Sequence, residues 1–181
     1  MSTRAAGERR IIPRQEWADN EVHRLPLVRG RPIRETWIHH SARSIPGGAD
    51  ATESQERAFL REVERFHIRE RGWFSIGYSF VIMPSGRIYE GRGWGARGAH
   101  TKDRNLLSYG ICFAGDFMQE DPTESSISAC RRLLSAGIRE GWLSGTQHPT
   151  GGHRDVVLAT TCPGDRLAAR LGDLRPEPRP S

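Results

Sequence analysis

Long hydrophobic runs are absent from this sequence of 181 residues. No apolar segment approaches the ~20 residues that a helix needs to cross a bilayer, so a transmembrane segment is not expected. The first ten residues, MSTRAAGERR, contain no hydrophobic core of the kind that a secretory signal peptide requires. The sequence therefore predicts a protein that is made in the cytoplasm and is exported, if at all, through a membrane pore or by cell lysis.

Cysteine is scarce, because the chain contains only Cys112, Cys130 and Cys162. An odd number of cysteines without close spacing argues against a disulfide framework. Cys112 falls in a nearly continuous apolar run, and Cys130 falls on the apolar stripe of an expected helix. Both are interpreted as core thiols, which leaves Cys162 as the thiol with a separate role.

Lysine is almost missing: Lys102 is the only lysine among the 27 basic residues, and the rest are arginine. The formal net charge of +5 and the isoelectric point of about 9.7 favour an anionic partner, either nucleic acid or a phosphate-rich polymer. The arginines are scattered rather than gathered in one run. A solvated basic surface is therefore favoured over a dedicated nucleic-acid patch.

Several common catalytic and binding motifs are also absent. The sequence contains no His-Glu-x-x-His helix, no Gly-x-Ser-x-Gly elbow, and no pair of Cys-x-x-Cys knuckles. The glycine-rich segment 91–95 lacks the Lys and Ser/Thr of a phosphate-binding loop. These absences argue against the corresponding metalloprotease, α/β-hydrolase, zinc-finger and nucleotide-binding classes.

The length and the mean hydropathy of −0.61 fit one soluble domain. Residues 1–10 are expected to be a disordered lead, and residues 175–181 a Pro-rich tail or linker, so the domain should span 11–174. Hydrophobic periodicity, a capping box at Thr52 and turn residues predict alternating strands and helices. Strands are expected at 36–41, 78–83, 87–90 and 109–114, and helices at 52–72, 123–140 and 164–171. This order predicts an α/β fold, a mixed sheet flanked by about three helices.

Three side chains could share one metal ion. His39 lies at the end of an expected strand, while His153 and Cys162 bracket one loop before an expected helix. Two imidazoles and one thiolate suit Zn²⁺, and three protein ligands leave the open position that marks a catalytic rather than a structural site. The alternative is that these three residues never meet. Side chains alternate along a strand, so His40 points away from His39 and is interpreted as a packing or support residue. His67 lies on an expected helix and is interpreted as a surface or partly buried residue that is not a ligand.

The sequence resembles a known family in a series of blocks that follow one another in order. The blocks are IIPRQEW at 11–17, WIHHSA at 37–42, IGYSF at 76–80, GRIYEGRGW at 86–94, GAHT at 98–101, Asn105, GICFAGDF at 110–117, GHRD at 152–155, and CPG at 162–164. Together they are similar to the type-2 N-acetylmuramoyl-L-alanine amidases, a family that includes phage lysis amidases and peptidoglycan-recognition proteins. The resemblance implies that family's fold.

The resemblance also implies roles for individual residues. His39, His153 and Cys162 match the zinc ligands, Tyr78 matches the catalytic tyrosine, and Thr160 occupies a position where some members carry lysine. A threonine can donate a hydrogen bond there but brings no positive charge. His100 matches a histidine of the substrate groove. Trp73, Arg92, Trp94 and Asn105 are further candidates for glycan or peptide contact, although the two tryptophans could equally be packed in the core.

Two features depart from the family pattern. The loop between His153 and Cys162 is one residue longer, which affects the placement of Thr160 more than that of the ligands. The close cysteine pair that forms a disulfide in animal recognition proteins is missing, which favours a bacterial or phage protein.

The resemblance implies a zinc-dependent enzyme that cleaves peptidoglycan between N-acetylmuramic acid and L-alanine, and a lysis enzyme (endolysin) is favoured. It would act on the cell wall as a monomer after release, with no nucleic-acid partner. Three alternatives remain: a non-catalytic peptidoglycan receptor on the same fold, a cysteine peptidase using Cys112 or Cys130, and a cytosolic amidase that recycles muropeptides.

Overall fold

A computed structural model describes residues 10–19, 25–28, 30–145 and 147–176. Six strands form one sheet in the order β1-β4-β3-β5-β2-β6. The strands are β1 (Ile11–Ile12), β2 (Glu35–His40), β3 (Phe80–Ile82), β4 (Ile88–Glu90), β5 (Ser108–Phe113) and β6 (Gly151–Gly152). Within the described ranges, no helix is both long and apolar enough to span a membrane. Most of the expected lead and tail lies outside the described residues.

The sheet is mixed, as the sequence predicts. β3 and β4 form the expected antiparallel hairpin, while β5 runs parallel to both β3 and β2. All six residues of β5 are buried, which fits a central strand covered on both faces. β2 also pairs in parallel with β6, and β1 with β4.

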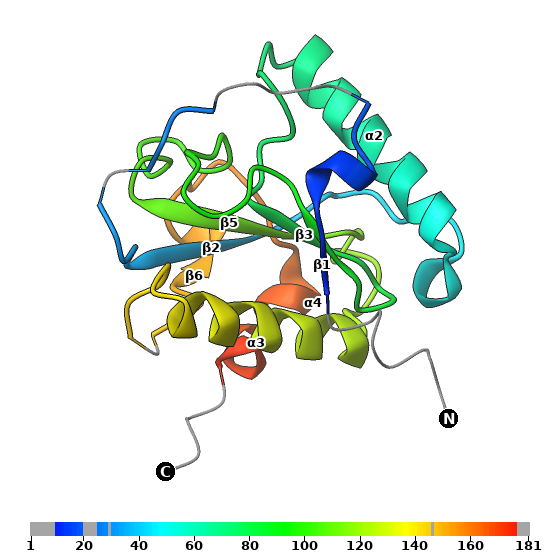
Figure 1. Ribbon diagram of the computed structural model, residues 1–181. Helices are drawn as coiled ribbons and strands as arrows, with labels where there is room; N and C mark the ends of the chain where they lie inside the picture. Colours follow the sequence, from blue (N-terminus) through cyan, green and yellow to red (C-terminus); the bar gives the residue numbers. More distant parts are fainter. Residues whose placement is uncertain (1–9, 20–24, 29, 146, 177–181) are drawn as a thin grey trace, which may run out of the picture.

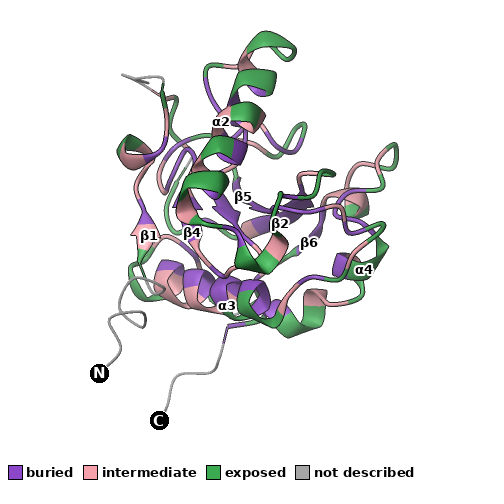
Figure 2. Ribbon diagram, turned by 90° about the vertical axis from the view of Figure 1, so that its right-hand side faces the viewer, coloured by how far each residue is buried: buried purple, intermediate pink, exposed green. Residues whose placement is uncertain are grey.

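Helix α2 (Glu53–Arg69) covers one face of the sheet. It begins at the predicted capping box, in which the Thr52 hydroxyl accepts from the Gln55 backbone N–H and the Gln55 side chain accepts from the Thr52 N–H. Phe59 and Leu60 are buried against a cluster that includes Val81 and Cys112. The C-terminal end of the helix extends beyond the sheet, where Figure 2 shows mainly exposed residues.

Helix α3 (Glu124–Arg139) covers the opposite face (Figure 1). Thr123 caps it by accepting from the Ser126 N–H, and the buried stripe of Ile127, Cys130 and Leu134 packs under the strands. Figure 2 shows this buried face turned toward the sheet. Cys130 and Cys112 are 0% and 1% exposed, so the prediction that both are core thiols is confirmed.

The structure differs from the sequence prediction at three elements. The expected helix over 164–171 is a short α4 (Asp165–Ala168) followed by a 3-10 turn, η4 (Leu171–Leu174). This break allows Leu167 and Leu174 both to pack in the core beside α3. Strands β1 and β6 were not predicted, because each has only two residues and β6 consists of glycine. Gly151 is required there, since an added Cβ would lie 2.6 Å from the Asp155 carboxylate and 3.1 Å from the Trp37 ring.

Glu56 joins α2 to the β3–β4 hairpin. Its carboxylate is fully buried, accepts a 2.7 Å hydrogen bond from the Tyr89 hydroxyl, pairs with Arg87 at 3.2 Å, and also accepts from the Ser85 hydroxyl. Removing one partner of a buried polar cluster leaves the others without compensation.

We expect Glu56→Ala to lower the free energy of unfolding by about 3 kcal/mol, because it strands the Tyr89 hydroxyl and the Arg87 guanidinium. Glu62→Ala is the matched control on the same helix, since Glu62 pairs with Arg43 at an exposed site. That change should cost less than ~1 kcal/mol. Urea unfolding measures both values, and equal losses would contradict the structural role of Glu56.

Candidate metal centre and its groove

The sheet brings His39, His153 and Cys162 together at one point. The parallel register pairs Ile38 of β2 with Gly152 of β6, so the histidine that follows each residue lies at the same end of two neighbouring strands. His153 begins the 3-10 turn η3 (His153–Asp155), and the loop after it returns Cys162 to the end of β2. One potential ligand atom from each residue lies within 4.8 Å of the others. The predicted meeting of these three residues is therefore confirmed as a matter of geometry.

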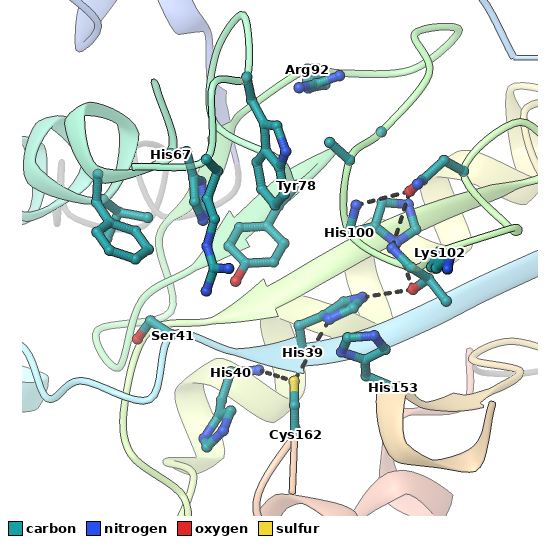
Figure 3. A pocket seen from close by; sticks show the side chains of 18 of the residues that line it. His39, His40, Ser41, His67, Tyr78, Arg92, His100, Lys102, His153 and Cys162 are labelled. Carbon is teal, nitrogen blue, oxygen red and sulfur yellow. Dashed lines mark hydrogen bonds between the residues drawn. The ribbon is translucent and has the colours of Figure 1, made fainter. Parts of the chain in front are cut away.

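Cys162 is held in place by the backbone of β2. Its Sγ lies 3.6 Å from His39 Nδ1 and accepts a 3.4 Å hydrogen bond from the His40 N–H (Figure 3). Burial raises the pKa of the Cys162 thiol to about 11, and the His40 N–H opposes that rise because it stabilises the thiolate. A cation beside the sulfur would shift the balance strongly toward the thiolate.

The imidazole of His39 is 1% exposed. Burial lowers the pKa of His39 well below its ordinary value, and the neighbouring His100 and His153 lower it further. Burial also lowers the pKa of His153. Both rings are therefore neutral near pH 7, which is the form of imidazole that binds metal ions. The donor set, two neutral imidazoles and a thiol that a cation would deprotonate, fits Zn²⁺.

The structure confirms the interpretation of His40 as a packing and support residue. Its ring is buried, its Nδ1 accepts from the Phe117 N–H at 3.3 Å, and it stacks on the Phe117 ring. Its contact with the site is made by its backbone N–H rather than by its imidazole.

The three donor residues lie on the floor of a groove of about 1060 Å³. Figure 3 shows the Tyr78 ring above His39 and Cys162, with His153 on the other side of His39. The ring centroids of Tyr78 and His39 are 5.4 Å apart. Burial, and then the nearby thiols of Cys112 and Cys162, raise the pKa of Tyr78 well above its usual value. Its hydroxyl stays protonated and can donate a hydrogen bond.

Helix α2 fixes the segment that leads into Tyr78. Glu64 accepts from the Ile76 N–H at 3.1 Å, and His67 Nδ1 accepts from the Gly77 N–H at 3.2 Å. On the other side of the segment, Arg92 Nε donates to the Ile76 carbonyl at 2.8 Å, and the Arg92 N–H donates to the Tyr78 carbonyl at 2.9 Å. Tyr78 is thus held by bonds to its backbone and to both preceding residues.

Thr160 lines the groove, and its Oγ1 accepts a 3.2 Å hydrogen bond from the Cys162 N–H. The hydroxyl keeps its own hydrogen, which can be donated to a ligand in the groove. Its predicted catalytic role stays a prediction.

Four of the five predicted substrate contacts line the groove: His100, Trp73, Arg92 and Asn105. The Trp73 ring is also packed, because an added Cβ on Gly77 would lie 2.5 Å from it. Burial lowers the pKa of Arg92 to about 10, and its guanidinium donates to two backbone carbonyls. Asn105 Oδ1 accepts from the backbone N–H groups of His100 and Thr101 at 2.8 and 3.0 Å.

Trp94, the fifth candidate substrate contact, does not lie in the groove. Its ring lies on the α3 face of the sheet, 4.4 Å from the Phe80 ring and 4.8 Å from the Tyr109 ring by centroid. Gly137 of α3 leaves the space for it, since an added Cβ would lie 2.8 Å from the indole. Core packing, the alternative reading of Trp94, is the one that the structure supports.

The structure adds His67 and Thr101 to the residues that line the groove, and neither was among the predicted site residues. His67 is 7% exposed, lines the groove, and lies 4.7 Å from the Trp73 ring by centroid. His67 lies seven residues after the buried Leu60, which places both on the inner face of α2. This spacing could have predicted from the sequence that His67 is buried. Thr101 was quoted only as part of a motif, and nothing in its spacing indicates the contact with His39 that the structure contains.

The site combines three convergent metal donors with a protonated phenol above them and an open groove. That arrangement could hold one metal ion at the base of a groove of about 1060 Å³. A family model described as N-acetylmuramoyl-L-alanine amidase (Amidase_2) matches residues 29–165, and the chain belongs to this family.

Known relatives include both recognition proteins and amidases. The chain is 38% identical to mouse peptidoglycan recognition protein 1 over 87% of its own length and 83% of the relative. It is 40% identical to peptidoglycan-recognition protein LE of Drosophila melanogaster and 36% identical to the pig N-acetylmuramoyl-L-alanine amidase. It spans only 38% and 26% of the lengths of these two relatives.

Solved structures confirm the fold. Peptidoglycan recognition protein LE in complex with tracheal cytotoxin, a monomeric diaminopimelic acid-type peptidoglycan, superposes with a TM-score of 0.80 at 36% identity. That comparison covers 88% of this chain and 91% of the neighbour. A bumblebee recognition protein, PGRP-SA, superposes with a TM-score of 0.82 at 32% identity and covers 94% and 99%.

The buried His67 predicts a pH-dependent stability of the metal-free protein. Burial lowers its pKa from 6.5 to about 4, so the unfolded state binds the proton more readily in that interval. The stabilisation is complete above about pH 6.5 and is lost as the pH falls toward 4.

Between pH 7 and about 4.5, the wild type should therefore lose roughly 2–3 kcal/mol more stability than His67→Gln. Urea unfolding at the two pH values measures the difference, and other titrating groups cancel because both proteins share them. Identical pH dependence in the two proteins would contradict a buried, neutral His67.

Proposed function

We propose that this protein is a zinc-dependent N-acetylmuramoyl-L-alanine amidase that hydrolyses the bond between N-acetylmuramic acid and L-alanine in peptidoglycan. The observation that carries the proposal is the convergence of His39, His153 and Cys162 beneath Tyr78 in an open groove. Membership of the amidase family supports the choice of bond.

His39, His153 and Cys162 would hold the metal ion. When bound, Zn²⁺ supplies Lewis-acid polarisation and makes water nucleophilic at neutral pH. Tyr78 keeps its proton because burial raises its pKa, so its hydroxyl donates to the carbonyl oxygen as negative charge develops there. Thr160, whose Oγ1 accepts from the Cys162 N–H, lines the groove and can add a second, neutral donor.

A non-catalytic receptor is the second candidate, because several relatives are named recognition proteins. The groove alone would serve either function. The donor set favours the enzyme, since a receptor has no need for a buried thiol between two imidazoles. The cysteine peptidase alternative is weaker, because burial raises the pKa values of Cys112 and Cys130 and holds both in the unreactive thiol form.

We further propose that the enzyme acts on the cell wall after release from the cytoplasm, as a lysis enzyme that works as a monomer. The net charge of +5 supports this proposal, because an anionic wall attracts a basic protein. The basic side chains of Arg43, Arg71, Arg97 and Lys102 line the groove itself.

Two substitutions separate metal binding from catalysis. We expect Cys162→Ala to lose both bound zinc and amidase activity, because it removes the thiolate ligand. Tyr78→Phe should retain zinc but lose about 100-fold in kcat, which is the usual effect of removing one donor to a developing oxyanion. Metal analysis by mass spectrometry and release of N-terminal alanine from digested sacculi measure the two properties. Full activity in a metal-free Cys162→Ala protein would refute the proposal.

The kind of substrate distinguishes a lysis enzyme from a recycling enzyme. A lysis enzyme should release peptides from intact sacculi at a rate comparable, per bond, with its rate on soluble muropeptides. A recycling enzyme should cleave only the soluble fragments. Zinc-loaded wild type tested on both substrates at equal bond concentration decides between them, and binding without cleavage of either would support the receptor.

A further inference from the structure

The second ring nitrogen of His39 also has a partner. While His39 Nδ1 faces Cys162, its Nε2 lies 3.3 Å from the Thr101 hydroxyl oxygen. That oxygen in turn lies 2.9 Å from His100 Nδ1. Thr101 is 0% exposed, so its hydroxyl has no access to bulk water to replace either contact.

We propose that Thr101 is a positioning residue for the metal centre: its hydroxyl oxygen accepts from His39 Nε2–H, which directs the lone pair of His39 Nδ1 at the metal. This proposal rests on the zinc site of the proposed function. It concerns how the ligand His39 is oriented, through the contact between its Nε2 and Thr101 Oγ1.

The direction of the hydrogen bond to His39 follows from the chemistry of imidazole. A neutral ring carries one N–H, and if Nδ1 is the ligand atom that hydrogen must be on Nε2. Thr101 Oγ1 is then the acceptor for His39, and its 2.9 Å contact with His100 Nδ1 holds the oxygen in place. The opposite direction would leave a hydrogen on His39 Nδ1, between the ring and the sulfur, where it would block metal binding.

The segment that carries Thr101 is held firmly on the side away from His39. Asn105 Oδ1 accepts from both backbone N–H groups of the His100–Thr101 segment, so the segment cannot rotate without losing two bonds. The His100 ring lies in a slot between Gly98 and Gly110, where an added Cβ would lie 2.2 and 2.4 Å from the ring. His100 and Asn105, which sequence comparison assigns to substrate contact, thus hold the hydroxyl that orients His39.

The test compares zinc affinity rather than activity alone. Thr101→Val keeps the shape of the side chain but removes the hydroxyl, and we expect the zinc dissociation constant to rise about 10- to 100-fold, as is usual when a partner of a metal ligand is lost. Thr101→Ser retains the hydroxyl and should stay within a few-fold of the wild type. Competition with a chromogenic chelator at fixed pH measures all the dissociation constants.

The chain offers a matched control on β2, the strand that carries His39. Thr36 is also 0% exposed, and its hydroxyl bonds to a buried imidazole, His148 Nδ1, at 3.0 Å. Because His148 is not part of the metal centre, Thr36→Val should leave zinc affinity unchanged while removing a similar buried bond. A comparable loss of affinity in Thr36→Val would show that the effect of Thr101→Val comes from general destabilisation, and would overturn the proposal.

A second measurement needs no substitution. Nitrogen-15 NMR of the histidine rings in the zinc-loaded wild type should show a proton on His39 Nε2 and metal on Nδ1. The reverse assignment, or an unchanged dissociation constant in Thr101→Val, overturns the proposal while leaving the proposed function intact. Failure of the wild type to bind zinc would instead refute the proposed function.

Discussion

The pairing of β2 between β5 and β6 is the interaction on which the candidate site depends. Its register places Ile38 opposite Gly152, so that His39 and His153 leave the ends of adjacent strands together. The last residue of β2 then holds the third donor, because the His40 N–H donates to the Cys162 sulfur. A slip of one residue would turn His39 to the α3 face and expose His40 to the groove. The site therefore also depends on β6, which consists of two glycines, and on the Trp37 ring that packs on it. Their contribution is to set the register that positions the donor residues.

Burial gives this cluster its chemical character. The same desolvation that keeps His39 and His153 neutral also opposes formation of the Cys162 thiolate. A divalent cation would reverse that balance at the sulfur, and its attraction would be strong because little water screens it. Around the cluster, side chains from other elements hold two of the backbone segments that carry site residues. Glu64 and His67 hold the segment before Tyr78, and Asn105 holds the segment that carries Thr101.

The sequence predicts the parts of this structure that local patterns determine. The capping box at Thr52, the apolar stripe around Cys130 and the hairpin at residues 84–86 indicate the two long helices and the strand pairs, and the structure confirms them. The motifs in which they occur indicated His39, His153 and Cys162 as metal ligands. Spacing along the chain could not show that residues more than a hundred positions apart meet. The sequence left Trp94 open between substrate contact and core packing, because its contacts with Phe80 and α3 depend on the three-dimensional packing. The contact between Thr101 and His39 of β2 is long-range and leaves no periodic signal in the sequence.

The choice between an enzyme and a receptor depends on what the floor of the groove requires. The walls, including Trp73 and the basic side chains, could bind an acidic glycopeptide without any metal. The floor is different, because a thiol and two imidazoles are packed together where burial disfavours their charged forms. Such a cluster contributes little to binding a sugar or a peptide, whereas it matches the ligand preference of Zn²⁺. The ring of the protonated Tyr78 lies 5.4 Å from that of His39 by centroid, beside the same cluster. This difference between the floor and the walls of the groove supports the proposed amidase over the proposed receptor.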